Sequence, residues 1–76
     1  MLNEVSIMVE VFKTNVMEAD EARQIIRELL VHFPEARINF DLEDCDKVLR
    51  VENSSIDVEK TVTVVKVIGY QCEVLG

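Results

Sequence analysis

One segment limits the possible folds of this chain more than any other: residues 22–33, which have the pattern of an amphipathic helix. Its apolar side chains recur at helical spacing, and charged and amide side chains occupy the opposite face. Pro34 ends the segment, because the residue before a proline is disfavoured in the α region. The apolar stripe consists of Ala22, Ile25, Ile26, Leu29, Leu30 and Phe33. Such a stripe needs a partner surface, which the neighbouring segments provide as strands.

The start of this helix has two interpretations. Asn15 followed by Glu18 would form a variant capping box, whereas Asp20 would cap a later start. A second helix is expected over residues 61–68, although their β-branched side chains favour a strand locally. The helical spacing of the apolar residues favours a helix over a strand. Asp57 or Ser55 would cap its start, and Gly69 would end it in a left-handed conformation. The residues at helical spacing are Val58, Val62, Val65 and Ile68.

Four segments alternate in the period-2 pattern of strands: residues 5–12, 37–42, 47–52 and 70–74. The polar residues 43–46 read as a hairpin turn between the second and third strands. In the first strand we expect one set of side chains to face the helices, namely Val5, Ile7, Val9 and Val11. In the last strand we expect Tyr70, Cys72 and Val74 to do so.

The resulting order, strand–helix–strand–strand–helix–strand, predicts an α+β ferredoxin-like βαββαβ sandwich. Its four-stranded antiparallel sheet would have the strand order 4-1-3-2, with two helices on one face. The chain has 76 residues, 49% hydrophobic and 30% charged, with no Pro/Gly-rich linker. We therefore expect one soluble domain spanning residues 1–76.

The charge balance narrows the classes of partner. Fifteen acidic and eight basic residues give a formal net charge of −7. Such a field repels nucleic acid and anionic membranes, so neither is an expected partner. No apolar run is long enough to span a bilayer, and the sequence starts without the pattern of a signal peptide. The expected location is the cytoplasm, where cysteines stay reduced.

Four features together resemble the heavy-metal-associated domain family, which comprises small copper and zinc chaperones and transporter modules. They are Met17 ahead of an Ala-x-x-Ala pair, the run over residues 37–43 leading into the hairpin, the capped second helix, and Gly69-Tyr70 before the last strand. The resemblance implies a Gly-Met-x-Cys-x-x-Cys loop before the first helix, with its methionine packed inward. Here the two cysteine positions are Ala19 and Ala22. Alanine has no lone pair, so the chain resembles a degenerate member that has lost the thiolate pair for soft metals.

The predicted topology permits a different cation site. It places the hairpin at the same end of the sheet as the loop before the first helix. Candidate ligands are Cys45, Asp44 and Asp46 from the hairpin with Glu18 and Asp20 from the loop. One thiol among carboxylates is incomplete for Zn²⁺ and poor for Cu(I), so a weak divalent cation is the expected ligand. An acidic turn that happens to contain a thiol, and a redox-sensing cysteine, are the alternatives.

The remaining reactive side chains point to structure rather than catalysis. Cys72 is expected in the core, too far from Cys45 for a disulfide, and His32 is expected to interact with the end of its helix. No Ser/His/Asp or Cys/His arrangement and no glycine-rich phosphate loop is present. We therefore expect no enzymatic activity and no resident cofactor.

These observations favour a non-catalytic binding or protein-interaction module, with cation binding at the hairpin as the alternative function. The expected partner is another protein or a second copy, docked on the open sheet face or on edge strand two or four. The apolar side chains expected on that open face are Met8, Phe12 and Val48.

Overall fold

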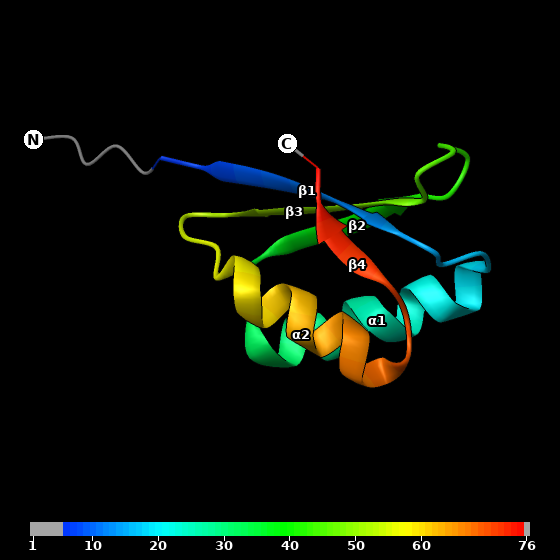
Figure 1. The fold of residues 1–76 in the computed structure, drawn as a ribbon. Coiled ribbons are helices and arrows are strands. Elements are labelled where there is room, and N and C mark those ends of the chain that lie inside the picture. Colours follow the sequence, from blue (N-terminus) through cyan, green and yellow to red (C-terminus); the bar gives the residue numbers. More distant parts are fainter. Residues whose placement is uncertain (1–5, 76) are drawn as a thin grey trace, which may run out of the picture.

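A computed structural model of the chain describes residues 6–75 (Figure 1). Two helices and four strands follow one another in the order β1-α1-β2-β3-α2-β4. Their bounds are β1 Met8–Thr14, α1 Ala19–His32, β2 Arg37–Asp41, β3 Val48–Asn53, α2 Val58–Ile68 and β4 Cys72–Val74. The predicted order of elements is confirmed, including the helix in the β-branched segment. Neither helix in the described part is long and apolar enough to cross a membrane.

The four strands form one antiparallel sheet, and both helices cover the same face of it (Figure 1). The strand order is β2-β3-β1-β4, which is the predicted order 4-1-3-2 counted from the other edge. The α+β ferredoxin-like sandwich is therefore confirmed. In the register, Phe12 lies opposite Leu49 on β3, and Phe40 on β2 lies opposite the same leucine.

The helix caps agree with the prediction for α2 but not for α1. The N-cap of α1 is Glu18, and its N–H donates to the Glu21 carboxylate at 3.2 Å. Neither predicted cap of α1 is used, and the helix starts three residues earlier than expected. The caps of α2 agree with the prediction, because the Asp57 carboxylate accepts the N–H of Lys60 at 3.0 Å. Gly69 closes α2 at φ 122°, a conformation that L side chains rarely adopt.

The predicted facing of the first strand is wrong for Ile7, Val9 and Val11, and Val5 lies outside the described residues. Phe12 is fully buried, whereas Ile7 and Val9 are 61% and 43% exposed. Residues 7–12 carry apolar side chains on both faces of the strand, so the alternation alone does not define the inner face. The pairing with β3 determines which face of β1 points to the helices. Phe12 and its cross-strand neighbour Leu49 must point the same way, and Leu49 is buried under the helices. Ile7 and Val9 therefore lie on the open face.

A single apolar cluster fills the space between the sheet and the helices. Its fully buried members come from both layers: Phe12, Val16, Ile25, Leu29, Leu49 and Val65. Cys72 belongs to this cluster, as predicted, and is 4% exposed. Val74 is on the inward face as predicted, opposite Phe12 in the register, but it is 44% exposed at the end of the short strand β4. The core thus extends along β1 only from Phe12 onward, and the first part of that strand lies outside it.

Candidate functional site

The β2–β3 hairpin is built by its own acidic side chains. The Asp41 carboxylate accepts the N–H groups of Glu43 and Asp44 at 3.2 and 3.3 Å. Lys47 adopts φ 46°, and its N–H donates to the Asp44 carbonyl at 3.0 Å. The Lys47 ammonium donates to the Leu42 carbonyl at 2.8 Å and so spans the turn. These contacts fix the backbone that carries the predicted hairpin ligands.

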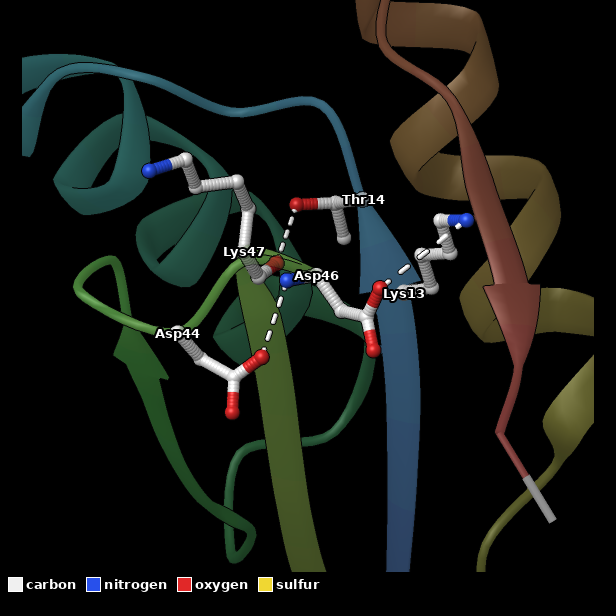
Figure 2. Close-up of polar contacts among 5 residues, drawn as sticks. All are labelled: Lys13, Thr14, Asp44, Asp46 and Lys47. Carbon is white, nitrogen blue, oxygen red and sulfur yellow. Dashed lines mark hydrogen bonds and ion pairs between the residues drawn. The ribbon is translucent and has the colours of Figure 1, made fainter.

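Three of the predicted cation ligands lie together at this turn. One ligand atom from each of Asp44, Cys45 and Asp46 lies within 4.8 Å of the others. The two carboxylates already have partners: Asp44 accepts the N–H of Asp46 at 2.8 Å, and an Asp46 oxygen lies 3.9 Å from the ammonium of Lys13 (Figure 2). Cys45 is a free, exposed cysteine. The set offers three ligands of mixed hardness, fewer than the four of a structural zinc site.

The two ligands predicted from the first loop do not belong to this group. Glu18 caps α1, and the Asp20 carboxylate pairs with the Arg23 guanidinium within the first turn of the helix. The expected approach of the loop to the hairpin occurs through Thr14 instead (Figure 2). Its N–H donates to the Asp46 carbonyl at 3.0 Å, and its hydroxyl donates to the Lys47 carbonyl. The five-residue site is therefore reduced to the three hairpin residues.

The loop that resembles a metal-binding loop also differs from expectation. Met17, predicted to pack inward, is 64% exposed. Val16, the residue before it, is fully buried instead. Ala19 is exposed at the first position of α1, and Ala22 is buried three residues later. The two alanines therefore lie on one side of the first turn, where neither offers a ligand atom.

An open groove of about 490 Å³ lies beside β4 and the end of α2. Its lining is Lys13, Thr14, Lys66, Tyr70, Gln71, Cys72 and Glu73. The Cys72 thiol is the one soft nucleophile in this lining. Burial raises the pKa of the Cys72 thiol to about 11. The positive charge of Lys66 lowers this pKa, and the negative charge of Glu73 raises it. The thiol is protonated near neutral pH, so the groove contains no activated cysteine.

The start of β1, with Ile7 just before it, is a second candidate site. Ile7, Met8 and Val9 are consecutive apolar residues, and each is more than two-fifths exposed. Other exposed large apolar side chains are separated along the chain: Met17, Val31, Val67 and Val74. The blue strand extends past the end of β4 in Figure 1. The start of β1 thus combines exposed apolar side chains with a position at the edge of the sheet.

The register shows which backbone groups are uncovered there. β4 pairs with β1 only over Phe12 to Thr14, and beyond that the Leu75 N–H donates to the Val11 carbonyl at 2.8 Å. Because backbone groups alternate in direction along a strand, those of Val9 point to the same side as those of Val11. Within the described residues, no strand lies beside them there. We call the backbone of Val9 on this side the free edge of β1.

The open face differs from the predicted one in two members. Phe12 is buried on the opposite side, and Met8, four residues before it in β1, alternates to that same side. Val48 is half-buried at the start of β3. The apolar side chains that follow β1 on this face are Ile7, Val9 and Val11. Arg50 and Glu52 lie across from Val11 and Val9 and are joined by a hydrogen bond of 3.1 Å. The apolar column is therefore bordered by a neutralised ion pair.

Sequence reasoning missed the free edge because it assigned β1 a full-length neighbour on each side. The signal was available in the lengths of the segments: the last strand-like run ends at residue 74, whereas the first spans more residues. In an antiparallel pair of unequal strands, part of the longer one has no partner. Comparison with known proteins gave no match to a family model, to a curated protein or to a solved structure.

Proposed function

We propose that this chain is a non-catalytic protein-interaction module that docks its partner along the first half of β1. The observation that carries the proposal is the run Ile7-Met8-Val9, exposed and uncharged at a free strand edge. Extended segments add to such edges through main-chain hydrogen bonds, and apolar side chains beside the edge supply the affinity. Contiguous exposed apolar residues of this kind can mark a protein-interaction site, and this run carries no charge in a chain of net charge −7.

The exposed valines of the two helices differ from the exposed run at β1. Val31 and Val67 are 73% and 81% exposed, more than any of the three residues of the β1 run. Each is a single apolar side chain on a helix, and isolated exposed residues of this kind are ordinary. Exposure alone therefore does not identify the docking site, whereas exposure beside backbone that no described strand covers does.

Site-specific photocrosslinking in cells that produce the chain tests this function. A photoreactive residue replaces Val9 in one variant and Val67, as the matched exposed control, in another. We expect discrete protein adducts from position 9 and none of equal yield from position 67. Equal adducts from both positions, or none from either, would refute docking along β1.

We further propose that the chain descends from heavy-metal-associated domains and acts in the cytoplasm. The support is the βαββαβ fold together with Ala19 and Ala22 on one side of the first turn of α1. The loss of both thiolates agrees with a binding role that no longer involves soft metal. The exposed Met17 is a further departure of this loop from the family pattern.

Binding of a divalent cation at the hairpin is the second candidate function. It is favoured by the 4.8 Å clustering of ligand atoms from Asp44, Cys45 and Asp46. Titration of the chain with Zn²⁺ and Mg²⁺, followed by two-dimensional NMR, tests it. Shifts confined to residues 43–47 that Cys45→Ser abolishes for Zn²⁺ would support the site. Shifts spread over the many surface carboxylates would refute it.

A further inference from the structure

We draw no further inference here: the strongest candidate, the open groove between β4 and the end of α2, has lysine and glutamate side chains of opposite charge in its lining that favour no one class of ligand, and nothing in the structure shows what covers it.

Discussion

Replacing Phe12 with alanine is the most direct test of how β1 faces the core. Phe12 is fully buried and lies between Leu49 on β3 and Val74 on β4. Removing a buried phenylalanine ring costs about 3–5 kcal/mol, through lost transfer free energy and the cavity left behind. At roughly 0.05–0.15 kcal/mol per residue, a chain of 76 residues has a free energy of unfolding of about 4–11 kcal/mol. The substitution should therefore remove about a quarter of the stability or more.

Val9→Ala is the matched control on the other face of the same strand. Val9 is 43% exposed, so its truncation should change the free energy of unfolding by about 0.5 kcal/mol or less. The chain has no tryptophan, and urea unfolding is therefore followed by far-ultraviolet circular dichroism. Phe12→Ala should lower the urea midpoint several-fold more than Val9→Ala, at a similar slope. A larger loss for Val9→Ala would mean that the strand faces the core with its odd-numbered residues, and the free edge would be assigned wrongly.

Three further predictions concern the core, the pH dependence and the alanine loop. Leu29→Ala, at a fully buried position of α1, should cost about 2–5 kcal/mol in the same urea assay, and a loss below about 1 kcal/mol would refute the packing of that helix. Burial raises the pKa of the Cys72 thiol from 9.0 to about 11, so the unfolded chain loses this proton at a lower pH than the folded chain does. The free energy of unfolding should therefore fall by up to about 3 kcal/mol between pH 9 and 11. Cys72→Ala should flatten this fall. Ala19→Cys combined with Ala22→Cys should create stoichiometric Cu(I) uptake, measured against a chelator, that wild type lacks; a folded double variant without uptake would refute the inherited loop geometry.

Much of the fold can be predicted from the sequence because its strongest patterns are periodic and end at clear signals. The stripe from Ala22 to Phe33 stops at Pro34, and the helical spacing in residues 58–68 outweighs β-branched propensity once Asp57 and Gly69 close both ends. The facing of β1 could not be predicted in this way. With Met8 and Phe12 on one face and valines on the other, only pairing with a buried partner strand decides which side faces the helices.

The candidate sites were less predictable because they depend on competition between partners. The topology correctly places the first loop near the hairpin, but Glu18 and Asp20 are used within α1 as a cap and an ion pair. Sequence spacing does not show which of several acidic residues a local backbone or a neighbouring arginine will engage. The free edge depends on where β4 ends, and element boundaries are the least certain part of a sequence-based prediction.

Amide hydrogen exchange at Val9, measured by NMR, tests the docking edge most directly. The Val9 N–H faces the free edge, whereas the Glu10 N–H faces β3 in the register that pairs Glu10 with Val51. We expect the Val9 amide to exchange rapidly and the Glu10 amide to be strongly protected. A Val9 amide that is protected as strongly as that of Glu10 would contradict the proposed edge.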